Sequence, residues 1–236
     1  MSQLSQAAEI VDRMPNSPES ASMGQSTVKN DPIIEQNPNP TTSTSFMFPQ
    51  SQEYQQKYMK TALQRHCAFY DRNCDGIISL TDTFRSLRAL GFNLVLSLVG
   101  TLLIHFTMSY QTSPTWIPSI WMPIYLDRIN RCQHGSTTKA YDFIGNVVSY
   151  PAVENVFFQF DPKKQGGLNY FQLIWMLWNL RDSFDPFGWI LSAFWWTGLY
   201  ILASNKGILS FQTMIAQYDG TLFYLIEQQR KLKKHS

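Results

Sequence analysis

The twelve residues DRNCDGIISLTD, at positions 71–82, have oxygen donors at the ligand positions of a loop that binds a hard cation. Gly76 stands at the sharp turn in the middle of this segment, and helical patterns flank it on both sides, as in an EF-hand. The sequence therefore predicts a calcium site, and the alternative is an acidic turn that binds no metal. The predicted ligands are the side chains of Asp71, Asn73, Asp75, Ser79 and Asp82 and the backbone carbonyl of Ile77.

The last position of this loop departs from the strongest form of the motif, because it holds Asp82 in place of a glutamate. Aspartate is one methylene shorter and reaches an ion more readily with one oxygen than with two. This lowers the coordination number and shifts the preference towards magnesium or weaker calcium binding. We expect calcium, and the choice between calcium and magnesium stays open.

EF-hands usually occur in pairs, and the segment DPKKQGGLNYFQ at residues 161–172 keeps part of the same pattern. Asp161, Gly166 and Leu168 stand at matching positions, whereas Lys163 and Gln165 replace acidic oxygen donors. This segment predicts a degenerate partner loop that holds no metal and packs against the loop at 71–82. A weaker trace of the pattern, SNKGILSF, lies near residue 207.

The other residues with reactive side chains support little by themselves. Taken alone, His66 is a polar residue on the helix that enters the loop, and His134 indicates a turn because a glycine follows it. His105 is expected to be a hydrogen-bonded histidine within an apolar helix. The cysteines are odd in number, lack CxxC spacing and are assigned no chemistry; they are Cys67, Cys74 and Cys132.

The composition excludes two classes of protein. At 236 residues the chain is long enough for one domain and a tail. Charged residues make up 15%, against roughly 25% in typical soluble domains, and aromatic residues reach 14%. The net charge of +2 is not gathered into a broad basic patch, which argues against nucleic-acid binding. The N-terminus lacks the basic and apolar regions of a secretory signal, which argues against a secreted disulfide protein.

The chain divides into three parts. Residues 1–50 hold half of the 12 prolines among small polar residues, so they cannot bury enough surface to offset their ordering entropy, and they are predicted to be a disordered tail. Residues 51–229 form the predicted domain, which begins with a helical pattern that leads directly into the acidic loop. Residues 230–236 are a basic C-terminal tail that is either solvated or in contact with anionic lipid.

Two charge-free segments point to a membrane. Residues 89–126 contain GFNLVLSLVGTLLIHFTM, which Asn93 and His105 interrupt, so an interfacial or re-entrant helix is favoured over one that spans the bilayer. The alternative is a buried core helix. The second segment, at 186–205, is rich in Trp and Tyr, which prefer the membrane interface. The patterns predict a mainly α fold built on an EF-hand pair, one loop active and one degenerate, with an apolar membrane-associated helix.

Several separated motifs, in the same order, resemble the caleosins, the lipid-droplet proteins of plants and fungi, and fungal members in particular. The resemblance extends from about Leu63 to about Phe223. Its motifs are LQRHCAFYDRNCDG around the acidic loop, SPTWIPSIWMPI, QHGSTTKAYD near residue 134, and GILSFQTMIAQYDGTLF near the C-terminus. The prolines Pro114, Pro118 and Pro123 resemble the proline knot of that family.

The resemblance implies a peroxygenase that uses haem b and an organic hydroperoxide, such as a fatty acid hydroperoxide, to transfer oxygen to an unsaturated lipid. The family's two histidines correspond to His66 and His134, which are the expected haem-binding and catalytic residues. The implied location is a lipid droplet or the endoplasmic reticulum membrane, on the cytosolic face. Because only four residues separate His66 from Asp71, we hypothesise that calcium binding controls the activity.

Three alternatives stay open. The aromatic pair Trp195 and Trp196 departs from the usual family sequence, so a polyketide or terpenoid is an alternative substrate to a fatty acid. A non-catalytic, calcium-responsive coat or docking protein of lipid droplets is the alternative function. Assembly into a homo-oligomer also stays open.

Overall fold

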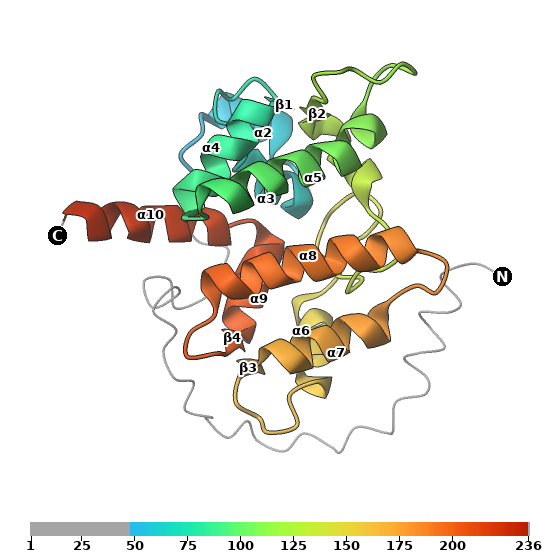
Figure 1. Ribbon diagram of the computed structural model, residues 1–236, viewed down its shortest axis with the longest axis vertical. Coiled ribbons are helices and arrows are strands. Elements are labelled where there is room, and N and C mark those ends of the chain that lie inside the picture. The colour runs from blue at the N-terminus through green and yellow to red at the C-terminus, as the bar shows by residue number, and fades with distance from the viewer. Residues whose placement is uncertain (1–47, 236) are drawn as a thin grey trace.

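The computed structural model describes residues 48–235, which form a mainly helical structure with four two-residue strands (Figure 1). The predicted disordered tail therefore lies outside the described residues, apart from its last three positions. In chain order the elements are α2 (Gln52–Tyr58), α3 (Ala62–Ala68), β1 (Ile77–Ile78), α4 (Leu80–Leu90), α5 (Leu94–Thr112), β2 (Ile124–Tyr125), the 3₁₀ helix η1 (Leu126–Cys132), α6 (Tyr150–Gln159), β3 (Gly167–Leu168), α7 (Tyr170–Leu180), α8 (Pro186–Ala203), β4 (Leu209–Ser210), α9 (Phe211–Asp219) and α10 (Leu222–His235).

The helical pattern that leads into the acidic loop is divided into two helices, α2 and α3. The break has a local cause at Thr61, whose hydroxyl accepts a hydrogen bond from the Gln64 backbone N–H. The Gln64 side chain accepts the Thr61 N–H in return, which completes a capping box. Such a box satisfies the unpaired backbone N–H groups at the start of a helix. A new helix therefore begins at this point, although the apolar spacing alone predicts one continuous helix.

The strand pairings correct the prediction about the partner loop. β1 pairs antiparallel with β2, with Ile78 opposite Ile124, and β3 pairs with β4. The prediction that 161–172 packs against 71–82 is therefore wrong, because its strand pairs with the segment near residue 207, the weaker trace in the sequence. The physical reason is that the chain returns from α5 directly beside β1, and the buried pair Ile78 and Ile124 occupies the edge that a second loop would need.

Each strand pair lies in its own half of the molecule (Figure 1). Helices α2 to α5 surround β1 and β2, helices α6, α7 and α9 surround β3 and β4, and α8 crosses between the two groups. α10 packs against α4 and α9 and so joins the halves, and Arg72 beside the acidic loop donates to Glu227 of α10 at 3.0 Å. Residues 230–235, expected as a separate basic tail, continue this helix.

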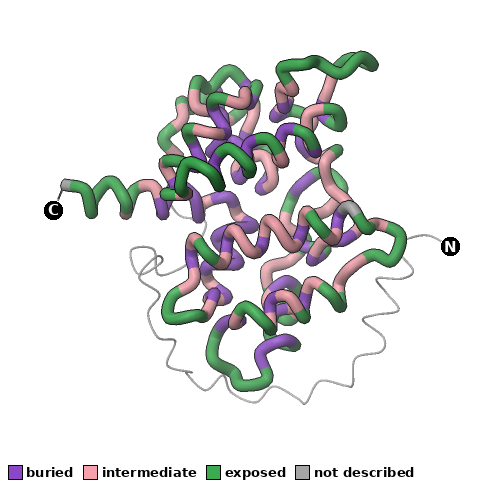
Figure 2. Tube along the Cα trace, in the orientation of Figure 1, coloured by how far each residue is buried: buried purple, intermediate pink, exposed green. Residues whose placement is uncertain are grey.

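α5 turns its apolar side chains away from the protein. Its buried residues are small or polar, among them Ser97, Thr101 and His105, whereas eight large apolar residues on it are exposed. Figure 2 shows this alternation along the helix. A buried core helix would have the opposite arrangement, so that alternative does not describe α5. Among the described residues, α5 alone is long and apolar enough to cross a membrane, and α8 contains a shorter apolar helix.

The segment between α5 and β2, residues 113–123, is an exposed loop that contains the three prolines. Four large apolar side chains on it are almost fully open, with exposed fractions between 74% and 93%. They are Trp116, Ile117, Ile120 and Trp121. An exposed apolar cluster of this kind, continuous in sequence with the outward face of α5, is typical of a surface that binds a partner or a lipid layer.

Candidate functional site

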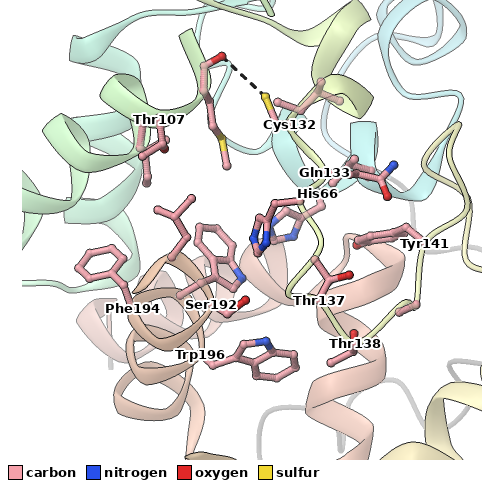
Figure 3. A pocket seen from close by; sticks show the side chains of 18 of the residues that line it. His66, Thr107, Cys132, Gln133, Thr137, Thr138, Tyr141, Ser192, Phe194 and Trp196 are labelled. Atoms are coloured by element: carbon pink, nitrogen blue, oxygen red, sulfur yellow. Dashed lines mark hydrogen bonds between the residues drawn. The ribbon is translucent and has the colours of Figure 1, made fainter. Parts of the chain in front are cut away.

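Both predicted histidines, His66 and His134, line one cavity of about 210 Å³, which we call the histidine cavity. Figure 3 shows this cavity, with His66 labelled. Its wall comes from five parts of the chain: α3, the inner side of α5, η1 with the loop that follows it, α8 and α9. Figure 3 shows Phe194 of α8 and Tyr141 of the loop on opposite sides of His66. The two apolar segments of the sequence, now α5 and α8, both contribute to this wall.

His66 lies on the last turn of α3 and is 5% exposed. Its ring packs edge-on against Trp195 of α8, at 5.3 Å between ring centroids, and at a tilt against Phe223 of α10, at 4.9 Å. Burial lowers the pKa of His66 to about 4, so the imidazole is neutral at neutral pH. The amide nitrogen of Gln217 lies 3.4 Å from Nε2 of His66. A neutral imidazole held between aromatic rings offers a lone pair to a metal or a proton.

His134 reaches the histidine cavity from the loop that follows η1, and its Nδ1 atom is buried. That atom lies 3.3 Å from Oδ2 of Asp185, within ion-pair distance but without hydrogen-bond geometry. Burial lowers the pKa of His134, and the Asp185 carboxylate acts in the opposite direction. His134 is therefore a histidine with one poorly satisfied ring nitrogen beside a carboxylate, which suits proton transfer.

Asp185 is held in place by the backbone. Its Oδ2 accepts the Ser136 N–H at 3.0 Å, and its Oδ1 accepts the Gly188 N–H at 2.8 Å as the N-cap of α8. These two bonds tie the start of α8 to the loop that carries His134. Burial raises the pKa of Asp185, but these hydrogen bonds and the nearby His134 outweigh it, so the net pKa is lowered and the carboxylate is charged at neutral pH.

His105 is fully buried but does not line the histidine cavity. Its Nδ1 lies 2.7 Å from the carbonyl oxygen of Met122 and its Nε2 lies 2.7 Å from the hydroxyl of Thr83. Nδ1 therefore donates to the carbonyl, and Nε2 accepts from the hydroxyl. The expectation of a hydrogen-bonded histidine in an apolar helix is confirmed, and the contacts join α5 to α4 and to the proline-containing loop.

The acidic loop at 71–82 brings its predicted ligands into one turn, where they hydrogen-bond locally. Asp71 is buried, and its Oδ2 accepts the Gly76 N–H at 2.7 Å and the Tyr54 hydroxyl at 2.6 Å. Gly76 has a φ of +87°, and a Cβ there would lie 2.3 Å from the Tyr58 ring, so this position requires glycine. Asp75 accepts the Ile77 N–H at 2.7 Å.

Asp82, the last predicted ligand, acts here as a helix cap. It accepts the Ser79 N–H and hydroxyl, and the Ser79 hydroxyl accepts the Asp82 N–H, which forms a capping box at the start of α4. Within residues 48–235, no group of three or more His, Cys, Asp or Glu side chains is placed to hold a metal ion. Cation binding at this loop therefore depends on the amide of Asn73, the hydroxyl of Ser79 and the carbonyl of Ile77 as well, and Asp82 must exchange partners.

Some residues of the histidine cavity were not predicted from the sequence. Gln217 of α9 and Tyr141 of the loop line it together with the histidines, and Asp185 supports His134 from outside the lining. The amide oxygen of Gln217 is buried and has no hydrogen-bond partner within the protein. Of these residues only Asp185 has a local signal, because an Asp before a Pro is typical of a helix N-terminus.

The histidine cavity fits haem in its donor chemistry. Two imidazoles face an apolar wall, His66 is neutral, and the buried polar atoms Nδ1 of His134 and Oε1 of Gln217 lack partners. The volume of about 210 Å³ lies below the ~300–1,000 Å³ usual for cofactor pockets. A second apolar cavity, between α5 and α8, adjoins it along the shared residues Ile104, Phe194 and Trp195.

Known proteins resemble this chain over most of its length. The family model described as "Caleosin related protein" matches residues 58–227. A peroxygenase of Lilium longiflorum is 33% identical over 183 residues, which cover 77% of this chain and 76% of the lily protein. Probable peroxygenase 4 of Arabidopsis thaliana is 36% identical over 172 residues, with 72% and 88% coverage.

A third relative, a probable inactive peroxygenase-like protein of Arabidopsis thaliana, is 27% identical over 162 residues, or 64% of this chain and 78% of that protein. No solved structure matches the chain at a significant level. The family model spans the acidic loop, both apolar helices and both histidines of the cavity, and two relatives exceed 30% identity over more than two thirds of the chain. The chain therefore belongs to the family of caleosin-related proteins.

Proposed function

We propose that this protein is a haem-dependent peroxygenase, which transfers an oxygen atom from an organic hydroperoxide to an unsaturated lipid. The observation that carries the proposal is the convergence of His66 and His134, from distant segments, on one buried apolar cavity. The names of two relatives, a peroxygenase and a probable peroxygenase, support the same reaction.

His66 and His134 would hold the haem, and a bound haem would supply the redox chemistry for oxygen transfer from the hydroperoxide to the lipid. His66 suits the role of the permanent ligand, because it is buried, neutral and fixed between Trp195 and Phe223. The apolar wall excludes water, which favours transfer of oxygen to a lipid over side reactions.

His134 suits the handling of the proton that the hydroperoxide gives up. Its Nδ1 lies beside the Asp185 carboxylate, which stabilises the imidazole when it becomes charged. Proton uptake and return at this residue is the expected contribution of the loop to the reaction.

We further propose that the loop at 71–82 binds calcium. The donor set consists of hard oxygen atoms from Asp71, Asn73, Asp75, Ser79, Asp82 and the Ile77 carbonyl, which is the chemistry that calcium prefers. The Asp71 backbone N–H donates to the carbonyl of Ala68, two residues after His66, so the loop is coupled to the end of α3. Calcium would fix this end and so regulate the position of His66.

The proposed location is the surface of a lipid droplet or the cytosolic face of the endoplasmic reticulum membrane. The outward apolar face of α5 and the exposed tryptophans Trp116 and Trp121 support it, since Trp favours the interface between lipid and water. Such a location would bring the cavity close to a lipid substrate.

The test is haem binding and oxygen transfer by the purified full-length protein. The wild type should show a Soret band after reconstitution with haem and should oxidise an unsaturated fatty acid when supplied with a fatty acid hydroperoxide. His66→Ala and His134→Ala should each lower haem content or shift the Soret maximum and abolish oxygen transfer.

His105→Gln is the matched control, because His105 lies outside the histidine cavity and glutamine can still donate and accept hydrogen bonds. It should leave the Soret band and the activity unchanged. If the wild type takes up no haem but still binds lipid surfaces, the peroxygenase proposal is wrong and the coat or docking function is the better account. The relative described as a probable inactive peroxygenase-like protein supports keeping that alternative.

A further inference from the structure

A second cavity, of about 430 Å³, lies between α5 and α8, and we call it the α5–α8 cavity. Its two long walls are matching stripes with a spacing of four residues. Leu96, Gly100 and Ile104 form one stripe on α5, and Phe194, Gly198 and Leu202 form the other on α8. Each stripe spans eight residue steps, a little over two turns and about 12 Å at the ordinary helical rise, with a glycine at its centre. We call the space between the two stripes the slot.

The lining of the α5–α8 cavity suits a hydrocarbon. It contains no charged residue, histidine, cysteine or methionine, and its only hydroxyl groups belong to Tyr70 and Thr197. Such a wall lacks the histidine, cysteine and methionine side chains that most often bind haem iron, and it offers no cationic partner to a haem carboxylate. An apolar cavity of about 150 Å³ in another protein stays dry and binds benzene, so a larger one of this kind has room for an alkyl chain.

The α5–α8 cavity is connected both to the histidine cavity and to the apolar surface. Ile104, Phe194 and Trp195 line both cavities, and the Trp195 ring packs against His66. At the outer side, Leu96 is 43% exposed and Ile201 is 62% exposed, and both also line the slot. A chain that enters from the exposed face of α5 would thus reach the wall beside His66.

We propose that the α5–α8 cavity binds the unbranched acyl chain of the lipid substrate and so directs its reacting part into the histidine cavity. The role of this site in catalysis rests on the proposed peroxygenase function, but binding of the acyl chain does not itself require haem. Gly100 and Gly198 determine the width of the slot, and hence which chains fit. The scarcity of polar groups in the lining favours a hydrocarbon chain over an oxygen-rich polyketide.

Gly198 offers a sharp test, because a Cβ built there meets no atom within 4 Å. Gly198→Leu therefore fills the slot without a backbone clash, and Gly198→Ala fills it less. Gly100 is less suitable, since its Cβ would approach Leu87 at 3.1 Å. The matched control is Val99→Phe, which adds volume on the outward face of α5, where Val99 is 50% exposed and lines neither cavity.

The measurement is quenching of tryptophan fluorescence by 9,10-dibromostearic acid, a saturated probe, in haem-free full-length protein. Gly198→Leu should raise the Kd of the probe by about tenfold or more, Gly198→Ala by less, and Val99→Phe should leave it unchanged. Equal Kd values for wild type and Gly198→Leu, or equal losses in Gly198→Leu and Val99→Phe, would overturn the proposal.

A second readout separates this proposal from the peroxygenase function. In haem-loaded protein, Gly198→Leu should keep oxygen transfer from cumene hydroperoxide to a small aromatic acceptor while losing activity on an 18-carbon fatty acid. Loss of activity on both substrates with a normal Soret band would also overturn acyl-chain selection by the slot. A wild type that binds the brominated acid but no haem would refute the enzyme and leave the acyl site standing.

Discussion

Nδ1 of His134 lies 3.3 Å from Oδ2 of Asp185, across the junction between the loop after η1 and the first turn of α8. The Asp185 carboxylate caps α8 and also accepts the Ser136 N–H, so it holds the loop that carries His134 against the start of α8. A carboxylate in this position stabilises the protonated form of the imidazole. Asp185 therefore influences the pKa of His134, the residue to which we assign proton transfer.

The first prediction concerns the charge on Asp185. Asp185→Asn removes the negative charge and keeps an oxygen to cap α8, so the pKa of His134, already lowered by burial, should fall further. NMR titration of the His134 ring protons in haem-free protein measures this directly. Asp182→Asn is the control, since Asp182 accepts the Phe184 N–H and makes no ion pair with His134. An unchanged titration of His134 in Asp185→Asn would contradict the assigned role.

The second prediction compares two glycines on α8. A Cβ at Gly188 would lie 2.6 Å from Nδ1 of His134 and closer still to the Asp185 carboxylate, whereas one at Gly198 meets nothing within 4 Å. Gly188→Ala should destabilise the protein by about 1–3 kcal/mol through overpacking. Gly198→Ala should stabilise it by about 0.5–1 kcal/mol through helix propensity. Urea unfolding of the wild type and the two variants, in one and the same detergent, measures both changes in stability. A gain in stability for Gly188→Ala would show that the protein is not tightly packed around Gly188.

The acidic loop was predicted from its spacing, because that pattern lies within twelve residues. His66 and His134 were predicted only from the family resemblance, because taken alone they indicate a polar helix residue and a turn. Their meeting in one cavity depends on how α3, α5 and α8 pack, and no spacing along the chain encodes that. Gln217 illustrates the limit, since a glutamine on an amphipathic helix is ordinary until its amide is found beside His66.

The same division holds for the fold. α4 follows from apolar periodicity and its caps, which act within one or two turns, whereas α5 follows from a charge-free apolar run with Asn93 as its cap. Strands of two residues, such as β2, carry no periodic pattern, so the pairing of β1 with β2 was not predictable from the sequence. The outward apolar face of α5 agrees with the membrane-associated helix that the sequence favoured, but a buried core helix stayed open as an alternative, because an apolar helix has the same sequence pattern whether protein or lipid surrounds it.

The third prediction is a pair of opposite pH dependences in haem-free protein. Burial lowers the pKa of His66 from 6.5 to about 4, so the unfolded state binds more protons between these values, and acid should destabilise the fold through His66. Burial raises the pKa of Asp219 from 3.8 to about 6, so the folded state binds more protons there, and its contribution should weaken as the pH rises. The two contributions to the free energy of unfolding have opposite pH dependences, and each amounts to about 3 kcal/mol at most.

Single variants separate these two contributions. Between pH 7 and pH 4, the stability of the wild type relative to His66→Gln should fall, whereas its stability relative to Asp219→Asn should rise. Urea unfolding at several pH values gives both differences. Parallel curves for the wild type and either variant would mean that the corresponding group titrates alike in the folded and unfolded states.

The fourth prediction tests the acidic loop by calorimetric titration with calcium. Asp75→Ala removes an exposed carboxylate that we propose as a ligand and should raise the Kd by about tenfold or more, while Asp161→Ala, in the degenerate loop, should leave it unchanged. Asp82→Glu should tighten calcium relative to magnesium by supplying a second carboxylate oxygen. Equal calcium binding by Asp75→Ala and Asp161→Ala would show that the loop at 71–82 is not the site.

The fifth prediction concerns attachment to lipid. Deleting α5 is unsuitable as a test, because this helix buries His105 and lines both cavities. The exposed side chains of the proline-containing loop can be changed without disturbing the core, so Trp116→Ser combined with Trp121→Ser is the better variant. Burial of one large apolar side chain contributes about 1.5–3 kcal/mol, and the double change should therefore lower partitioning onto oil droplets by more than about tenfold.

Flotation with phospholipid-coated triacylglycerol droplets measures this partitioning. Phe143→Ser is the matched control, since Phe143 is 84% exposed but lies on the loop after η1, away from α5 and the prolines in sequence. It should float like the wild type. If the tryptophan variant floats equally well, or if Phe143→Ser is lost from the droplets to the same extent, the lipid contact does not depend on the proline-containing loop, and the outward face of α5 would have to account for attachment alone.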